Sequence, residues 1–223
     1  MAQNRESIRD TIRMLLGETS AVFWTDAMLN QWLEDGQLDI VYRTKSKRRT
    51  GYITTVADTM EYTLSTYMTD ILDIGGPVRV YDGTNSKWCD SMDGMTRERM
   101  EDEYPNWEST DTSGEPTMYW YDVELNKFWV YQPPSSQYAG TNYLKVPYIA
   151  KPTVMSSDTT SPDIPEVLYP ALQEWVVSKG RESRGYSDMA AQSMGNYMAL
   201  VQSYKSIGKP KEDIDIIIKN YRR

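Results

Sequence analysis

Apolar residues recur at helical spacing near the start of the chain. Between residues 6 and 16 they fall on one face of a helix with 3.6 residues per turn, and Gly17 is suited to end that helix. Thr25 is suited to cap a second helix that runs to about residue 44. The predicted apolar faces are Ile8, Ile12, Leu15 and Leu16 in the first helix, and Met28, Leu29, Trp32, Leu33, Gly36 and Ile40 in the second.

Helical spacing returns after residue 163. Pro165 is suited to the first turn of a helix that ends at Gly180 or Gly185, and Ser187 is suited to cap a last helix that ends before Gly208. The predicted apolar faces are Leu168, Leu172, Trp175 and Val176, then Ala190, Met194, Tyr197, Met198, Val201 and Tyr204.

The central part of the chain has the composition of strands. Residues 117–132 hold two aromatic runs around a short polar turn, which predicts a β-hairpin. Pro147 favours an edge strand or a strand end for the run that contains it. Further strands are predicted at 51–56, 62–64, 78–81 and 142–149, a short acidic helix at 95–104, and a linker at 152–163.

These elements predict an α+β protein. The N- and C-terminal helices are expected to build an antiparallel helical bundle, with a central antiparallel β insertion and an extended C-terminal tail. We expect the helical core to comprise residues 1–49 and 160–207, the insertion residues 50–159, and the tail residues 208–223.

Isoleucines and aspartates lie close together in the tail, and three of the isoleucines recur at a spacing of two. Ile214, Ile216 and Ile218 are spaced by two, with Asp213 and Asp215 between or beside them. An alternating tail is a candidate for adding a strand to the sheet edge of a partner. The other interpretation is a strand or helix that packs on its own domain.

Composition restricts the chemistry. The chain has 24 Lys and Arg against 32 Asp and Glu, a net charge of −8, no histidine, and Cys89 as its single cysteine. Histidine-based catalysis, zinc sites rich in His or Cys, and tight clamping of nucleic acid are therefore not expected. The 17 Tyr and 7 Trp against 2 Phe are typical either of surfaces that become buried on assembly or of ordinary strands.

No motif indicates an enzyme, a cofactor or a metal site. The acidic side chains of Glu98, Glu101, Asp102 and Glu103 are candidates for the paired carboxylates of a glycosidase, although such a run usually forms a solvated helix face. The first residues lack the apolar core of a signal peptide, and no apolar run is long enough to cross a membrane. We therefore expect no catalytic residues, no cofactor, no metal and no membrane partner.

A basic run follows the second predicted helix. Lys45, Lys47, Arg48 and Arg49 are candidates for a contact with DNA or with an acidic partner. The same residues are also what a solvated helix C-terminus favours, because cations interact well with that end of a helix.

The order of these elements resembles the head-to-tail adaptor, connector or head-completion proteins of tailed bacteriophages. The resemblance is carried by Phe23-Trp24-Thr25-Asp26 with Leu29, Trp32 and Leu33, by Phe128-Trp129-Val130-Tyr131-Gln132-Pro133-Pro134, by Asp163-Ile164-Pro165-Glu166, and by the run from Ala190 to Tyr204. It spans most of the chain.

This resemblance implies a structural virion protein at the head–tail interface, assembled in the host cytoplasm. Family members form a ring, commonly of twelve copies, that binds the portal protein and carries a downstream nozzle or tail-tube protein. Genomic double-stranded DNA passes through the ring without specific binding. The resemblance also implies portal docking by the tail, through Ile214, Ile216, Ile218, Tyr221, Arg222 and Arg223. The alternatives are another tail or baseplate protein, and a cell-wall hydrolase that uses Glu98 and Glu101.

Overall fold

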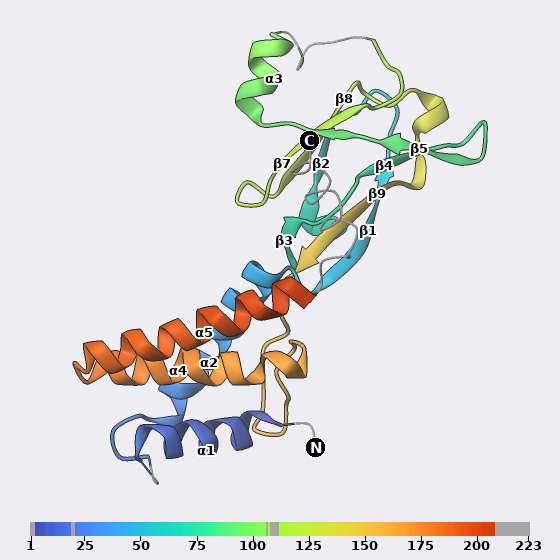
Figure 1. Ribbon diagram of the computed structural model, residues 1–223. Coiled ribbons are helices and arrows are strands. Elements are labelled where there is room, and N and C mark those ends of the chain that lie inside the picture. Colours follow the sequence, from blue (N-terminus) through green and yellow to red (C-terminus); the bar gives the residue numbers. More distant parts are fainter. Residues whose placement is uncertain (1–2, 19–20, 106, 108–111, 208–223) are drawn as a thin grey trace, which may run out of the picture. The chain divides into compact units, whose positions relative to one another are not determined.

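The computed structural model describes residues 3–18, 21–105, 107 and 112–207. The chain divides into two compact units (Figure 1). The helical unit comprises Met1–Ser46 and Pro152–Arg223, and the β unit comprises Lys47–Lys151. The described residues contain five α-helices and two sheets, so the predicted α+β class is confirmed.

The two N-terminal helices begin and end at residues suited to these positions. Helix α1 (Arg5–Leu16) begins after Asn4, whose side-chain oxygen accepts a hydrogen bond of 2.9 Å from the backbone N–H of Ser7. It ends at Gly17, which has the left-handed φ of 75° that glycine adopts without steric cost. Helix α2 (Asp26–Thr44) begins after Thr25, whose hydroxyl accepts from the N–H of Met28 at 3.2 Å, as predicted.

The buried faces of these helices differ in part from the predicted apolar faces. Ile8 and Ile12 of α1 are fully buried, and so are Leu29, Leu33 and Ile40 of α2. Leu15 and Met28, however, are 50% and 38% exposed, so their assignment to the core was wrong. In α1 the reason is that two arginines, described below, occupy the buried face and move its centre away from Leu15.

The first of the two C-terminal helices begins later than predicted. A single 3₁₀ turn, η4 (Glu166–Leu168), follows Pro165, and the α-helix α4 (Tyr169–Ser183) starts after it with Pro170 in its first turn. Helix α5 is Ser187–Ile207. Helix α4 contacts α1, α2 and α5 and is therefore the central element of the helical unit (Figure 1).

Glycines allow α1 and α2 to approach α4 closely. A Cβ atom built on Gly36 of α2 would lie 2.5 Å from Cδ1 of Trp175 in α4. A Cβ atom on Gly180 of α4 would lie 2.8 Å from Cδ1 of Leu16 in α1. Both distances are far below van der Waals contact, so these crossings depend on the absence of a side chain at each glycine.

Three arginines spaced by four along α1 form an ion-pair ladder. Arg5 binds Asp158 at 2.9 Å, and Arg9 binds the same carboxylate at 3.0 Å. Arg9 also contacts Asp26 of α2 at 3.2 Å, and Arg13 binds Asp26 at 2.6 Å. The side chains of Arg9 and Arg13 are 8% and 7% exposed, so these pairs are shielded from water on the arginine side.

The segment predicted as a linker is fixed to α2. It has no regular secondary structure, but the fully buried Gln37 donates to the carbonyl of Thr153 at 3.1 Å and accepts from the N–H of Asp163 at 2.7 Å. Met155 is buried, and its N–H donates to Glu34 at 2.7 Å. The segment is therefore part of the helical unit.

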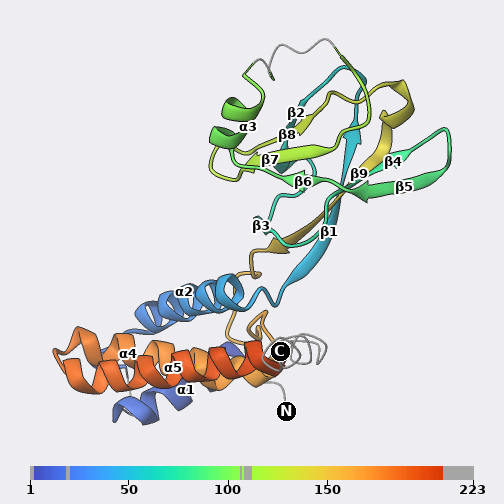
Figure 2. The same cartoon turned by 45° about the horizontal axis from the view of Figure 1, so that its top comes forward.

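The β unit contains two sheets (Figure 2). The larger sheet has the order β1-β9-β4-β5, with β3 pairing with β9 beside β4: β1 (Arg48–Thr55), β9 (Gly140–Ala150), β4 (Arg79–Asp82), β5 (Lys87–Ser91) and β3 (Ile71–Ile74). The smaller sheet has the order β2-β8-β7-β6: β2 (Glu61–Thr63), β8 (Lys127–Tyr131), β7 (Met118–Asp122) and β6 (Asp93–Gly94). Short helices complete the unit: η1 (Leu64–Thr66), α3 (Arg97–Glu103) and η3 (Ser136–Tyr138).

The hairpin of β7 and β8 has the alternating faces that the sequence predicts. Its inner face contributes Tyr119, Tyr121 and Phe128 to a core shared by both sheets. Its outer face carries Trp120 and Trp129, which stack with centroids 3.5 Å apart. The core between the sheets consists of Ile53, Tyr62, Leu64, Met68, Ile71, Val78, Val80, Met92, Phe128, Val130, Leu144, Val146, Tyr148 and Ala150.

Two features of the sheets differ from the prediction. The pair β6–β7 is parallel, whereas the insertion was expected to be antiparallel. Pro147 lies inside β9, which is paired on both sides, so the assignment to an edge or strand end was wrong. Its carbonyl accepts from Gly75 in the segment between β3 and β4, and its ring nitrogen faces the same side. The missing N–H therefore falls where β9 changes partner from β4 to β3.

Glu18 organises the segment between α1 and α2. Its carboxylate accepts from the backbone N–H groups of Val22 at 3.0 Å and Phe23, and it pairs with Arg13 at 3.0 Å. Burial acts to raise the pKa of Glu18, but the backbone donors and Arg13 outweigh it and lower that pKa.

Replacing Gly36 by alanine is expected to destabilise the protein. In a helix interior, alanine normally makes the protein about 0.5–1 kcal/mol more stable than glycine does. Here the added Cβ overpacks against Trp175, which costs about 1–3 kcal/mol of stability and outweighs that gain. Gly195→Ala in α5 is the matched control, because its Cβ would meet no atom within 4 Å, and it should stabilise the protein. Urea unfolding of the two variants measures the difference. A stabilised Gly36→Ala variant would contradict the close crossing.

Glu18→Gln is expected to lower the free energy of unfolding at pH 7 by about 1–2 kcal/mol, because the amide keeps an acceptor but loses the charge. The pKa of Glu18 is lowered in the folded state, so its contribution is present above the unfolded value of 4.5 and is lost as the pH falls through the folded pKa. The gap between wild type and variant should therefore close below pH 4. A gap that stays constant between pH 7 and pH 3 would refute this role.

Candidate functional site

The predicted basic run spans the boundary between the two units, and its two arginines lie on different faces of one strand. Lys45 ends α2 in a left-handed conformation, and its Nζ lies 4.4 Å from the ring centroid of Tyr42. The boundary between the two units falls just before Lys47. Arg48 and Arg49 lie on opposite faces of β1 because side chains alternate along a strand. Of the four residues, Arg49 pairs with Asp70 at 2.6 Å, whereas Arg48 is exposed.

Arg48 belongs to an outer sheet face that the sequence alone did not reveal. The face lies opposite the core on the larger sheet, and its members alternate with core residues such as Ile53, Val80 and Leu144. We call it the cationic–aromatic face: Arg48 and Tyr52 of β1, Arg79 and Tyr81 of β4, Trp88 of β5, and Tyr143 and Lys145 of β9.

The rings of this face form a continuous chain of contacts. Tyr143 meets Tyr81 edge-on at 5.0 Å between centroids, and Tyr81 meets Trp88 at 5.3 Å. Trp88 in turn lies 6.4 Å from Tyr52, and the Nζ of Lys145 lies 6.0 Å from the Trp88 ring. Tyr52 and Trp88 remain 42% and 37% exposed, so the chain of rings presents aromatic surface to solvent.

Two like charges face each other across this surface. Arg79 and Lys145 are direct partners in the register of β4 and β9, and Lys145 is also the partner of Tyr52 in β1. Neither cation forms an ion pair with a residue in the part of the chain that the structure describes. Like charges directly opposite each other destabilise a sheet, so the isolated β unit carries an electrostatic cost that an anionic partner would relieve.

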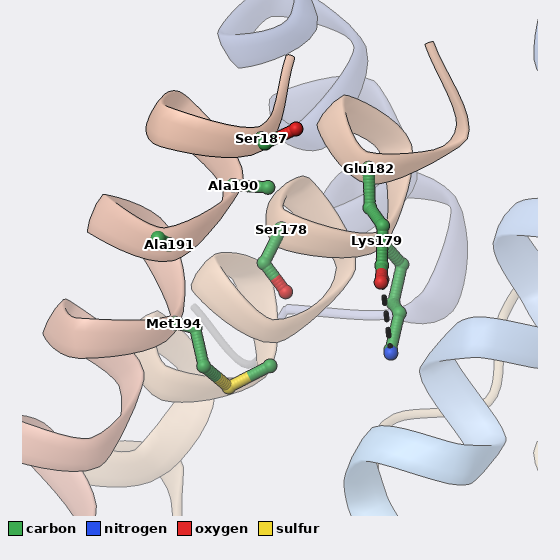
Figure 3. Close-up of a pocket in the computed structure, with 7 residues that line it drawn as sticks. All are labelled: Ser178, Lys179, Glu182, Ser187, Ala190, Ala191 and Met194. Carbon is green, nitrogen blue, oxygen red and sulfur yellow. Dashed lines mark hydrogen bonds and ion pairs between the residues drawn. The ribbon is translucent and has the colours of Figure 1, made fainter. Parts of the chain in front are cut away.

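The helical unit carries a small cavity between α4 and α5, with a volume of 320 Å³ (Figure 3). Most of its lining side chains are small, and the ion pair of Lys179 with Glu182, at 3.2 Å, lies at its side. The lining residues are Ser178, Lys179, Glu182, Ser187, Ala190, Ala191 and Met194. Of its polar side chains, the Ser178 hydroxyl donates to the carbonyl of Trp175 at 2.7 Å.

The candidate carboxylates of a hydrolase lie on the exposed surface of α3. Glu101 binds Arg97 at 2.7 Å and Glu103 binds Arg99 at 2.6 Å, both as pairs spaced by four along the helix. Glu98 is exposed to solvent. Glycosidase carboxyls flank the bond that they break, whereas these point outward around one short helix.

Other chemistry has little support among the described residues. Burial, with a smaller contribution from Glu115, raises the pKa of the Cys89 thiol to about 11, so thiolate is scarce at neutral pH. Within the described ranges, no three acidic or cysteine side chains are grouped to hold a metal ion. None of the helices in these ranges is both long and apolar enough to span a bilayer.

The residues predicted to dock on a portal lie outside the described residues. They are Ile214, Ile216, Ile218, Tyr221, Arg222 and Arg223.

The protein exposes aromatic and cationic side chains on a sheet of the β unit and apolar side chains on helices of the helical unit, and both are features of proteins that work by binding other macromolecules. The comparison with known families is consistent with this class. The model of the SU10 adaptor protein family matches residues 4–214, which includes both units, so the chain belongs to this family of bacteriophage adaptor proteins. The resemblance to phage head-to-tail adaptors is thereby confirmed. No curated protein matches the chain.

The cationic–aromatic face predicts an unusual response to removing charge. Arg79→Thr should raise the free energy of unfolding by about 0.2–1 kcal/mol, because it removes the repulsion with Lys145 and places a strand-favouring residue in β4. The gain should shrink at high salt, where surface charges are screened. Arg49→Thr is the matched control and should destabilise slightly, because it breaks the pair with Asp70. Urea unfolding of both variants at low and high salt measures these changes. An equal loss of unfolding free energy in the two variants would contradict the repulsion between Arg79 and Lys145.

Proposed function

We propose that the protein is a structural component of the virion that joins the portal at the capsid vertex to the tail. In this proposal twelve copies form a ring, and the ring surrounds the channel through which genomic double-stranded DNA passes. The portal lies on one side and a downstream nozzle or tail-tube protein on the other. The observation that carries the proposal is the family match, which runs through the helical unit and the β unit without interruption.

The surface of the helical unit supports assembly into a ring. Apolar side chains are exposed on the outer face of α2, at Met28, Leu38 and Tyr42, and on α5, at Met189, Met198, Leu200 and Ile207. Exposed apolar side chains gathered on helices are typical of protein interfaces. A head-to-tail ring also needs two different surfaces on each subunit, and α2 and α5 are separate elements that can supply them.

In the proposed ring, helices of the N- and C-terminal segments form an antiparallel bundle around the channel, and the β unit contacts the tail or the exterior. Twelve copies with a net charge of −8 each carry 12 × −8 = −96 formal charges. Acidic side chains on the channel wall would repel DNA and let it slide, whereas Lys47, Arg48 and Arg49 would retain it weakly if they line the channel.

The tail from residue 209 to 223 is proposed to dock on the portal. Its isoleucines at a spacing of two, Ile214, Ile216 and Ile218, suit strand addition to a sheet edge, where the main chain supplies affinity and alternate side chains enter pockets. Tyr221, Arg222 and Arg223 would complete the contact. The chain thus has a separate segment for the portal besides the surfaces that bind other copies.

Particle mass tests the ring. Mass photometry of the purified protein with its portal should show twelve added copies, about 310 kDa from twelve chains of 25.8 kDa.

Deleting residues 209–223 should abolish portal binding and leave the helical content unchanged in circular dichroism. Two full-length variants separate the isoleucines from the rest of the tail. The variant with Ile214, Ile216 and Ile218 changed to serine should lose portal binding. The control variant with Lys209→Ser and Lys211→Ser should keep it. Wild-type binding by the deletion would disprove the tail contact, and single copies under all conditions would disprove the ring.

A further inference from the structure

The β unit carries opposite kinds of surface on its two outer sides. The inner faces of the two sheets share one core, so their outer faces point away from each other. The larger sheet presents the cationic–aromatic face. Helix α3 lies on the outer side of the smaller sheet (Figure 2). Its Met100 packs with Trp107 and Trp120, and Trp129 joins this cluster.

Helix α3 presents unpaired acidic side chains to solvent. It contains Arg97 and Arg99 against four acids, and these arginines bind Glu101 and Glu103. Glu98 and Asp102 are exposed, and neither forms an ion pair with a residue in the described ranges. They are spaced by four along the helix, so their side chains are neighbours on its outer surface.

From these surfaces we infer that the β units of neighbouring copies dock head to tail, with the cationic–aromatic face of one copy against α3 of the next. Arg79 and Lys145 pair with Glu98 and Asp102, and Tyr52 and Trp88 become buried beside them. This inference rests on the proposed ring and deepens it, because it names an interface between copies that lies outside the helical units.

The geometry of the charges favours a second copy as the partner. Residues spaced by four on a helix have Cβ atoms about 5–6 Å apart, and direct cross-strand partners about 4.5–5.5 Å apart, so two carboxylates meet two cations at nearly the same separation. The pairing also removes the repulsion between Arg79 and Lys145. Tyrosine, tryptophan and arginine are the residues that most often dominate the energy of protein interfaces.

The arrangement of the two surfaces fits a closed ring. They differ from each other and lie on opposite sides of one compact unit, which is what a head-to-tail contact requires of each subunit. The acidic net charge of the chain and its local cationic face are then both accounted for, because one copy supplies the acid that the next one needs.

Charge reversal on each side tests this interface in the full-length protein. One variant carries Arg79→Glu and Lys145→Glu, and the other carries Glu98→Lys and Asp102→Lys. Each alone should need at least about tenfold more protein to reach half-maximal ring assembly, because like charges then meet at the interface. A 1:1 mixture should assemble at the wild-type concentration, because each cation-side reversal then faces an acid-side reversal in an alternating ring. Lys151→Glu, exposed beyond the end of β9, is the matched control and should behave as wild type.

The outcomes separate this inference from the proposed function. Normal assembly by both reversed variants would overturn the inference and leave the ring intact, whereas failure of the wild-type protein to form rings with or without portal would overturn the proposed function. Circular dichroism and thermal unfolding establish that the variants fold.

Zero-length carbodiimide cross-linking identifies the occupant directly. In rings made from isotopically labelled and unlabelled protein, Lys145 should link to Glu98 or Asp102 of a different copy. A link from Lys145 to a carboxylate of the portal or of a tail protein would overturn the inference and assign the face to that protein.

Discussion

The helical unit depends on the ion-pair ladder of α1. Arg9 and Arg13 are nearly buried, and a buried guanidinium without a partner costs several kcal/mol, so Asp26 and Asp158 must stay in place. Asp26 opens α2, and Asp158 lies in the segment that follows the β unit. The ladder therefore joins three parts of the chain, and two of them, α1 and α2, are the helices that cross α4 closely at Gly180 and Gly36.

The sequence predicted those elements whose signals are local. Thr25 and Gly17 mark helix ends through their own chemistry, and the aromatic hairpin from 118 to 131 has alternation that no distant residue alters. The ladder was missed although Arg5, Arg9 and Arg13 are spaced by four. Helical spacing shows that they share a face, but only their carboxylate partners, one of them 149 residues away, make that face a buried one.

The order of the strands could not be predicted from the sequence, because it also depends on partners that are distant along the chain. Pro147 suggests an edge strand when β9 is considered alone, and its place inside the sheet becomes possible only because β3 and β4 share one side of β9. The short strands β3, β5 and β6 were not predicted, since each is defined by its partner more than by its composition.

The cationic–aromatic face is likewise made of residues from four strands, and only one of these residues, Arg48, belongs to the predicted basic run. Arg48 was found and Arg79 and Lys145 were not, because alternation shows that a side chain points outward but not which outward side chains are neighbours.

The β unit begins and ends on paired strands. Arg48 at the start of β1 is the register partner of Ile149 near the end of β9, and the N–H of Ala150 donates to the carbonyl of Lys47 at 2.9 Å. An inserted unit whose two ends are adjacent can be exchanged as a cassette, because removing it leaves a gap that a short turn can close. Replacing this cassette would change what the β unit touches, while the helices keep their own ladder and crossings.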